Sequence, residues 1–375
     1  MKAIPIFRAR GLILAAALGV NIGFTSLAFA QINSRAVIVN PDGKVTYLGT
    51  LGGRFSFATD INDSGQVVGQ SETAGGSTHA FITGPNGMGM TDLGTLGGVY
   101  SYATGINDSG QVAGNSSTTA DDYSHAFITG PTGMGMTDLG TLSYATGINN
   151  SGQIIGDRVT AGGPFHAFIT GPNGMGMTDL GTTSNVAGIN DSGQVVGWSS
   201  TADGSTHAFI TGPNGMGMTD LGTPLGGTSS GASAINDAGQ VAGASYTADG
   251  SSHAFITGPN GMGMTDLGTL GGISSDATGI NDSGQVVGFS VTEDGLRHPF
   301  ITGPNGTGMI DVNSYADLPD GVFVSSVGGI NNLGQIIAVT VIPEPAPYAL
   351  MLAGLGFVGF MARQKKPTDN TVALG

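Results

Sequence analysis

Two short signatures recur along the chain at nearly constant spacing, and this internal repetition restricts the fold more than any other feature of the sequence. The first signature is Ile-Asn-Asp-Ser-Gly-Gln, which begins, with small variations, at Ile61, Ile106, Ile148, Ile189, Ile235, Ile280 and Ile330. The second is His-Ala-Phe-Ile-Thr-Gly-Pro, which begins at His79, His125, His166, His207, His253 and, as His-Pro-Phe, at His298. A degenerate copy without histidine opens at Arg35, so we count seven units of about 45 residues.

Each unit is expected to contain four short strands. Its segments are too short for helices, alternate in side-chain direction and are separated by Gly, Pro and Asn. In the unit that contains His79, the expected strands are 57–62, 66–69, 79–83 and 90–94. The 68 glycines in 375 residues also favour tight turns over helices.

Four short strands per unit are typical of a β-propeller blade, whereas β-helix rungs are usually shorter and helical repeats need a 3.6-residue period that this chain lacks. We therefore predict an all-β fold, a seven-bladed β-propeller of four-stranded repeats over residues 31–341. We expect the last strand, from Gln335, to pair with the first, from Ala36, and so to close the ring. Unit length varies after the Leu-Gly-Thr-Leu-Gly-Gly segment and before each histidine, where we expect surface loops.

Residues 1–30 have the pattern of a secretory signal peptide. Three basic residues precede an apolar run, and the run ends in the small-residue pattern Ala28-Phe29-Ala30. This pattern predicts cleavage after Ala30 and export through the secretion machinery. A retained membrane anchor is the alternative, which the interrupted apolar run disfavours.

A second apolar segment lies near the C-terminus, within residues 342–366. Its three parts are Pro343-Glu344-Pro345, an uncharged stretch at 348–362, and the basic residues Arg363, Lys365 and Lys366. Their order resembles the PEP-CTERM sorting signal, which exosortase-type enzymes recognise in bacteria with an outer membrane. The resemblance implies an exosortase-type partner and a transmembrane-like sorting helix that associates with the inner membrane, transiently or as a retained anchor, with its basic end in the cytoplasm. Residues 367–375 extend beyond the usual end of this signal, and we expect them to form a disordered tail.

The repeat units also resemble the HAF family of probable extracellular repeats, in the His-Ala-Phe motif and in the Gly-Ile-Asn-Asp-x-Gly-Gln segment. The resemblance covers the chain from about Ala36 to Val341. It implies an exported, propeller-like protein of the cell envelope or the extracellular space, and it implies no reaction.

The region between the two ends is strongly acidic. Residues 31–342 contain 5 Lys and Arg and 24 Asp and Glu, a net charge of about −19. We expect no nucleic-acid partner, because phosphate binding requires clustered Lys and Arg. The chain has no cysteine, which excludes disulfides and thiolate metal sites.

Histidine is the first candidate for chemistry, since all six histidines lie in the repeats and imidazole serves as a base or a metal ligand. Equivalent residues of a ring are separated by a whole blade, however, whereas metal ligands must converge on one ion. We therefore expect a structural histidine that bonds a neighbouring turn or strand, as in WD-repeat propellers.

Paired methionines and repeated aspartates are the remaining candidates, and neither leads us to expect a cofactor. The pairs begin with Met88 and Met90, which could offer two thioethers to Cu(I) if they share a strand face. Aspartates recur in the hairpin turns at Asp63, Asp108, Asp191, Asp237 and Asp282. No unit has the oxygen density of a calcium loop, so we interpret these aspartates as turn residues, with Ca2+ bound between blades as the alternative.

Residues that break the repeat pattern are the places to look for a specific site. They include Asp157-Arg158, Glu293-Asp294, Arg297 and three aromatic residues, Trp198, Tyr123 and Tyr246, which we predict as ligand contacts. No catalytic constellation stands out from the repeats. We therefore expect a non-catalytic, exported surface or matrix protein that binds polysaccharide or protein. An exported propeller hydrolase or lyase acting on glycans is the alternative.

Overall fold

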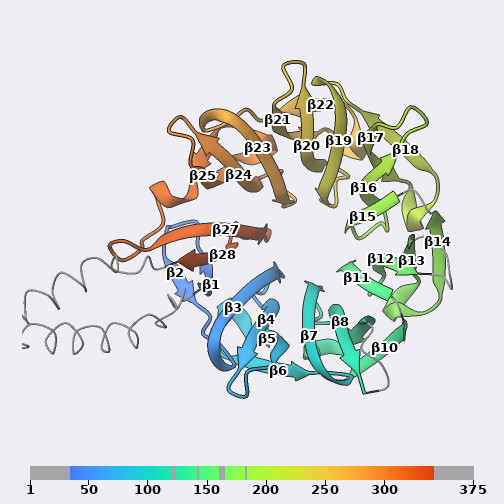
Figure 1. Ribbon diagram of the computed structural model, residues 1–375, viewed down its shortest axis with the longest axis vertical. Coiled ribbons are helices and arrows are strands. Elements are labelled where there is room, and N and C mark those ends of the chain that lie inside the picture. The colour runs from blue at the N-terminus through green and yellow to red at the C-terminus, as the bar shows by residue number, and fades with distance from the viewer. Residues whose placement is uncertain (1–33, 120–123, 142, 160–164, 182–183, 342–375) are drawn as a thin grey trace, which may run out of the picture. The chain divides into compact units, whose positions relative to one another are not determined.

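The computed structural model describes residues 34–119, 124–141, 143–159, 165–181 and 184–341 (Figure 1). Residues Ser34–Val341 form one compact unit. The predicted signal peptide with its cleavage site, the apolar sorting helix, the tail and Tyr123 lie outside the described residues. Within the described ranges the helical elements are single 3-10 turns, so none has the length and apolarity that crossing a bilayer requires.

Strands of seven repeat units surround a central opening, with four antiparallel strands in each unit (Figure 1). The inner strands are β3 (Gly52–Ile61), β7 (Gly97–Ile106), β11 (Ser143–Ile148), β15 (Ser184–Ile189), β19 (Gly226–Ile235), β23 (Gly271–Ile280) and β27 (Phe323–Ile330). The second strands are β4 (Val67–Thr73), β8 (Val112–Thr118), β12 (Ile154–Val159), β16 (Val195–Ser200), β20 (Val241–Thr247), β24 (Val286–Thr292) and β28 (Ile336–Val341).

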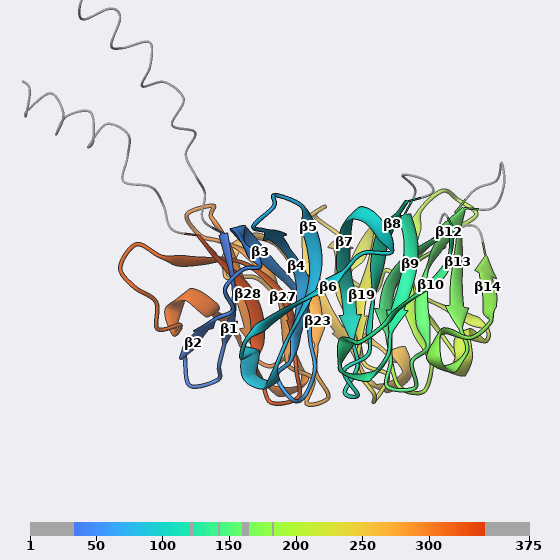
Figure 2. The same ribbon diagram turned by 90° about the horizontal axis from the view of Figure 1, so that it is seen from below.

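The third and outer strands complete each unit. The third strands, which carry the His-Ala-Phe motif, are β1 (Ser34–Val39), β5 (Thr78–Thr83), β9 (Ser124–Thr129), β13 (Phe165–Thr170), β17 (Thr206–Thr211), β21 (Ser252–Thr257) and β25 (Arg297–Thr302). The outer strands are β2 (Val45–Tyr47), β6 (Met90–Gly94), β10 (Met136–Thr141), β14 (Met177–Gly181), β18 (Met218–Gly222), β22 (Met264–Asp266) and β26 (Met309–Asp311). Figure 2 shows these strands running between the two faces of the ring.

Short 3-10 turns join the third strand to the outer strand in six units. They are η1 (Pro85–Gly87), η2 (Pro131–Gly133), η3 (Pro172–Gly174), η4 (Pro213–Gly215), η5 (Pro259–Gly261) and η6 (Pro304–Gly306), while η7 (Val312–Ser314) follows β26. In η1 both Asn86 (φ 54°) and Gly87 (φ 73°) have positive φ, a conformation that Asn and Gly tolerate best.

The prediction of seven separate four-stranded blades is wrong. Five sheets are separate four-stranded blades, and the sixth is an eight-stranded sheet. The larger sheet forms because β5 and β7 make a parallel bridge between Thr78 and Tyr100, which joins the units β3–β6 and β7–β10. Two neighbouring repeat units of the sequence therefore share one sheet.

The last strand closes the ring, as the sequence predicted. β28 pairs antiparallel with β1 in continuous register from Ser34 opposite Val341 to Val39 opposite Ile336. β27 pairs with β28 on the other side, so one blade combines strands from the two ends of the described region.

The hydrophobic core lies between neighbouring units. Phe127 from one unit packs in a cluster with Val68 and Ile82 of the unit before it, and equivalent clusters recur around the ring. The six phenylalanines of the His-Ala-Phe motifs are fully buried. The motif thus supplies about 2–3 kcal/mol of apolar burial per unit at each junction.

Unit length varies in the inner strands and not only in surface loops, which corrects part of the loop prediction. β3, β7, β19 and β23 have 10 residues, and β11 and β15 have 6. In a longer strand the first residues cover the end of the second strand, as Gly52 does opposite Thr73. Among the described residues, Val159 and Ser200, the last residues of β12 and β16, have no such partner on the inner strand.

Candidate functional site

Seven asparagines form a closed hydrogen-bonded ring around the central channel. This asparagine ring consists of Asn62, Asn107, Asn149, Asn190, Asn236, Asn281 and Asn331, all of them buried. The side-chain amide of Asn107 donates to the carbonyl oxygen of Asn149 in the next unit at 3.1 Å. The same contact recurs in every unit, and Asn331 closes the cycle by donating to Asn62 at 3.0 Å. The Asn of the Ile-Asn-Asp-Ser-Gly-Gln signature therefore joins the units.

One mouth of the channel carries a second closed cycle, which we call the aspartate mouth. Its residues are Asp63, Asp108, Asn150, Asp191, Asp237, Asp282 and Asn332, around a space of about 170 Å³. The backbone N–H of each residue donates to a side-chain oxygen of the next, and Asn332 closes the cycle on Asp63 at 2.8 Å. The turn aspartates of the sequence analysis thus bond neighbouring backbone across unit boundaries.

The two asparagines of the aspartate mouth separate some of its carboxylates. The Asn150 amide donates to Asp108 and Asp191, and the Asn332 amide donates to Asp63 and Asp282, all at 2.8–2.9 Å. Asp237 instead lies between two carboxylates. Burial, together with the charges of Asp191 and Asp282, raises its pKa. Across the described residues, no group of three His, Asp or Glu side chains is arranged to hold a metal ion.

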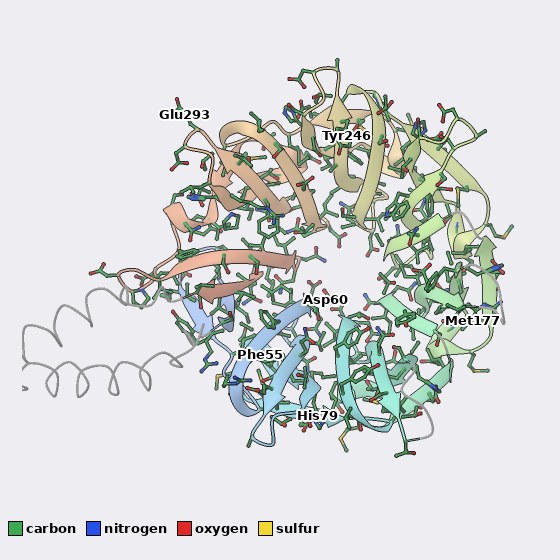
Figure 3. All side chains as sticks on the ribbon, in the orientation of Figure 1. Phe55, Asp60, His79, Met177, Tyr246 and Glu293 are labelled. Carbon is green, nitrogen blue, oxygen red and sulfur yellow. The ribbon has the colours of Figure 1, made fainter. Side chains whose placement is uncertain are left out.

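The other half of the channel contains one residue that breaks the symmetry, Asp60. It occupies a position that is Gly or Ala in the other units, for example Gly105 and Ala234. Figure 3 shows Asp60 at the inner end of β3, beside the central opening. Its carboxylate accepts from the backbone N–H of Ile61 and, across the unit boundary, of Ile106, both at 2.9 Å. Burial raises the pKa of Asp60 to about 6 against these two bonds.

All six histidines bond a neighbouring strand, as predicted. In each of the six units that has a histidine, Nδ1 bonds the aspartate thirteen residues later, on the neighbouring outer strand, at 2.7–2.9 Å. In the first such pair, Asp92 accepts both from His79 and from the backbone N–H of Gly94, at 2.7 Å for the latter. The pair therefore holds the outer strand to the rest of its sheet, and Figure 3 shows His79 far from the channel.

The two methionines of the first pair do not lie on one strand, the arrangement that the Cu(I) alternative assumed. Met88 follows the 3-10 turn and is 73% exposed, whereas Met90 opens strand β6 and packs on the core cluster of Phe81. The two thioethers consequently face different environments.

Trp198 and Tyr246, two of the predicted ligand contacts, lie together in one cavity of about 600 Å³. We call this cavity the aromatic pocket. Trp198 is 40% exposed on β16, and Tyr246 is 47% exposed on β20 of the adjacent blade. Figure 3 shows Tyr246 on its blade. The pocket shares Ala187 and Ser233 with the half of the channel that contains Asp60.

The aromatic pocket exists because one inner strand lacks a side chain. Gly231 of β19 occupies the place that Phe57, Tyr102 and Tyr144 take in other units, one residue before the repeated Ala. A Cβ added at Gly231 would meet Trp198 at 3.8 Å, an ordinary contact distance, so the space beside Trp198 is open. Gly231 was not among the site residues predicted from the sequence, although the aligned repeats have it as the one glycine at this position.

The polar lining of the pocket is rich in hydroxyl groups and contains one carboxylate. Thr206, Ser229, Ser233 and Ser252 contribute hydroxyls, and Asp276 of β23 accepts from Ser252 Oγ at 3.2 Å. No Lys or Arg is among the described lining residues.

The other asymmetric residues lie elsewhere. Arg297 stacks on Phe289 at 3.8 Å from the ring centroid, and Glu293 is exposed at the outer edge of its blade (Figure 3). Asp157 lies in a separate, smaller pocket.

Comparison with known proteins identifies the sorting motif and supports the fold. Residues 341–366 match the PEP-CTERM protein-sorting motif, which includes the predicted Pro-Glu-Pro and basic residues. The motif supports export, sorting to the membrane or cell envelope, and processing by an exosortase-type enzyme. No curated protein matches the chain.

Solved β-propellers resemble the chain at low sequence identity. The β-propeller domain of the Trilobed protease from Pyrococcus furiosus is similar over 73% of this chain and 86% of its own, at 11% identity and a TM-score of 0.51. A puromycin-hydrolyzing peptidase from Mycobacterium tuberculosis is similar over 77% of this chain, at 11% identity and a TM-score of 0.50, and this chain spans 53% of its length. The putative TolB from Agrobacterium tumefaciens is covered over 99% of its length and this chain over 83%, at 11% identity and a TM-score of 0.48. The first two similarities show a β-propeller fold. Together with the motif match, they indicate an exported β-propeller that carries a PEP-CTERM sorting signal.

Proposed function

We propose that this exported protein binds polysaccharide at the cell surface or in the extracellular matrix, without catalysis, through the aromatic pocket. One observation carries the proposal: Trp198 and Tyr246, which break the repeat pattern, border the same cavity together with Asp276 and several hydroxyls. Its volume of about 600 Å³ falls in the usual range of roughly 300–1,000 Å³ for small-ligand sites.

The chemistry of the lining suits a sugar. A sugar ring has apolar C–H faces, which pack on aromatic side chains, and hydroxyl groups around its edge, which need hydrogen-bond partners. Trp198 and Tyr246 offer aromatic faces, and Asp276 offers an acceptor that two or more hydroxyls can share. A flat protein partner would leave these polar groups unpaired.

The single carboxylate favours binding over glycan cleavage. Most glycoside hydrolases need two carboxyl groups about 5–9.5 Å apart, one as acid and one as base or nucleophile. Asp276 is the one Asp or Glu among the described residues that line the aromatic pocket.

We further propose that the seven units are repeats of the HAF type and that residues 1–30 are removed on export. The roles of the motif support the repeat assignment, because His79 bonds the outer strand while Ala80 and Phe81 are buried in the core. The sorting helix would then associate with the inner membrane until an exosortase-type enzyme acts near Pro343.

Retention of the purified full-length protein on exopolysaccharide isolated from the source bacterium tests the binding function. We expect Tyr246→Ala and Trp198→Ala each to weaken retention at least tenfold, because a stacked aromatic face is lost. Tyr47→Ala is the matched control, since Tyr47 is 46% exposed on β2 in another blade.

Equal retention of all four proteins would refute the assignment to this pocket. Release of new reducing ends from the polysaccharide, abolished by Asp276→Asn, would instead support the hydrolase.

A further inference from the structure

A second, smaller pocket lies at the next unit boundary, between the β11–β14 and β15–β18 blades. Its volume is about 310 Å³, and it is lined by Tyr144, Asp157, Phe165 and Asn185. The rings of Tyr144 and Phe165 lie 6.4 Å apart between centroids, with their planes tilted by 48°. Phe165 is 56% exposed and lies outside the repeat pattern, because most other units have Thr or Ser before the histidine, as at Thr78 and Ser124.

Residues of the β15–β18 blade line both the second pocket and the aromatic pocket. Asn185 of β15 and Trp198 of β16 are directly opposite each other in the register of their sheet. Asn185 lines the second pocket and Trp198 lines the aromatic pocket. A chain-like ligand that occupies one pocket can therefore continue into the other past this pair.

Both pockets owe their openness to local departures from the repeat. β11 and β15 are the two short inner strands, so within the described ranges no residue of theirs pairs with the ends of β12 and β16 as Gly52 of β3 pairs with Thr73. Asp157 and Trp198 occupy the same position in successive units, directly after the repeated glycine of the second strand. The second pocket is thus the aromatic pocket's counterpart one unit earlier.

The electrostatics of the two pockets are alike. Each has one carboxylate, Asp157 or Asp276, and neither has a Lys or Arg among its described lining residues. Asp157 Oδ1 is buried without a hydrogen-bond partner among the described atoms. Burial raises the pKa of Asp157, and a buried acceptor of this kind is stabilised by a hydroxyl or ammonium donor and destabilised by another anion.

We propose that the two pockets are successive subsites for one linear glycan, whose residues at these subsites are uncharged or amine-bearing and not uronic acids. The inference rests on the proposed polysaccharide-binding function and adds to it the length and charge class of the ligand. Trp198 and Tyr246 hold one part of the glycan, and Tyr144 and Phe165 hold the next. The two carboxylates accept hydrogen bonds from hydroxyl or ammonium groups and repel carboxylate groups.

Binding of purified full-length protein to matched oligosaccharides by titration calorimetry tests the proposal. The probes are di- and hexasaccharides of three classes: neutral glucans and galactans, β-linked glucosamine oligomers, and galacturonate oligomers. We expect a neutral or amine-bearing hexasaccharide to bind at least tenfold more tightly than its disaccharide, and the galacturonate hexamer to bind at least tenfold more weakly. Phe165→Ala should abolish the tighter binding of the hexasaccharide relative to the disaccharide, while the affinity for the disaccharide stays within twofold of the wild type.

The variants separate this inference from the function on which it rests. If none of the oligosaccharides binds, and Trp198→Ala leaves exopolysaccharide retention unchanged, the proposed function itself fails. If Trp198→Ala abolishes binding but di- and hexasaccharides bind equally and Phe165→Ala has no effect, the second subsite alone is refuted. Tightest binding by the galacturonate hexamer would overturn the charge class. Thermal melting by circular dichroism confirms that each variant is folded, and Asp157→Asn, which keeps the shape of the side chain, should raise galacturonate affinity.

Discussion

The aspartate mouth and the aromatic pocket use the seven repeat units in opposite ways. At the aspartate mouth every unit contributes an equivalent residue, and the bonds between units form closed cycles. At the aromatic pocket the neighbouring units differ, because Gly231 leaves a space that aromatic residues occupy at Phe57, Tyr102 and Tyr144. In this molecule, repeated residues hold the ring together, and a cavity with ligand-binding character appears where the repetition stops.

We expect the largest loss of folding stability when the asparagine ring is broken. The side-chain amide of Asn149 donates to Asn190 and Gln153, and its side-chain oxygen accepts from Ser151 and the backbone of Gln153. Asn149→Ala would leave several buried groups unpaired, so we expect the free energy of unfolding to fall by about 2–4 kcal/mol. Urea denaturation measures this loss, and glycan affinity of the folded protein should stay unchanged. A loss below about 1 kcal/mol would mean that the cycle is not what holds neighbouring units together.

A smaller effect is expected at Asp60, the asymmetric residue of the channel. Its pKa rises from the usual 3.8 to about 6 in the folded protein, so the folded state keeps a proton that the unfolded chain has lost. The stability that Asp60 contributes is therefore fully present below pH 3.8 and is lost as the pH rises through about 6. Asp60→Asn keeps only one of the two acceptor oxygens, but it cannot titrate, so we expect its stability relative to the wild type to rise by about 1–3 kcal/mol between pH 3.5 and pH 7.5. Denaturation at pH 3.5 and pH 7.5 compares the two proteins, and equal pH slopes would show that the Asp60 carboxyl does not titrate in this range.

Filling the aromatic pocket tests whether the place where the repetition stops is the polysaccharide-binding surface. Gly231→Tyr introduces the kind of residue that other units have at this position, and the Cβ has room for it. We expect the melting temperature to change little and the affinity for polysaccharide to fall at least tenfold, or about 1.4 kcal/mol, because the cavity is occupied. Retention on exopolysaccharide measures the loss. Full retention by a folded variant would place the binding surface elsewhere.

The smallest effect is expected at the repeated histidines. His207 bonds Asp220 on the outer strand, but both side chains are partly exposed, so water replaces much of the lost interaction. We expect His207→Ala to lower the free energy of unfolding by about 0.5 kcal/mol, well below the effect of Asn149→Ala. A loss as large as that of Asn149→Ala would contradict the distinction between the buried asparagine ring and the exposed histidine bonds.

The repeats allowed much of the architecture to be predicted, because spacing and turn residues report local structure directly. The four strands of each unit, the structural histidines, the closure by β28 and the turn role of Asp63 all follow from such patterns. The eight-stranded sheet did not follow, because a single bridge between Thr78 and Tyr100 depends on the approach of two units.

The candidate site was predictable only in part. Trp198 and Tyr246 stood out as exceptions among the repeats, but nothing local indicated that they share a cavity. Gly231 was not predicted because it contributes to the site by lacking a side chain. Asp276 was not predicted because it reaches the pocket from a third blade, where it bonds Ser252. Asp60 could have been noticed as the one acidic residue at a position that is otherwise Gly or Ala, but its burial-induced pKa shift is a property of the folded channel.

The pairing of β1 with β28 also ties the completion of folding to the completion of synthesis. Synthesis from the N-terminus supplies β1 first, and β1 has no partner strand on its inner side until β28 is made about 300 residues later. The sorting motif begins at Val341, the residue where β28 ends. The blade that seals the ring can therefore assemble only when synthesis has reached the sorting motif, so a truncated chain would leave the inner edge of β1 unpaired.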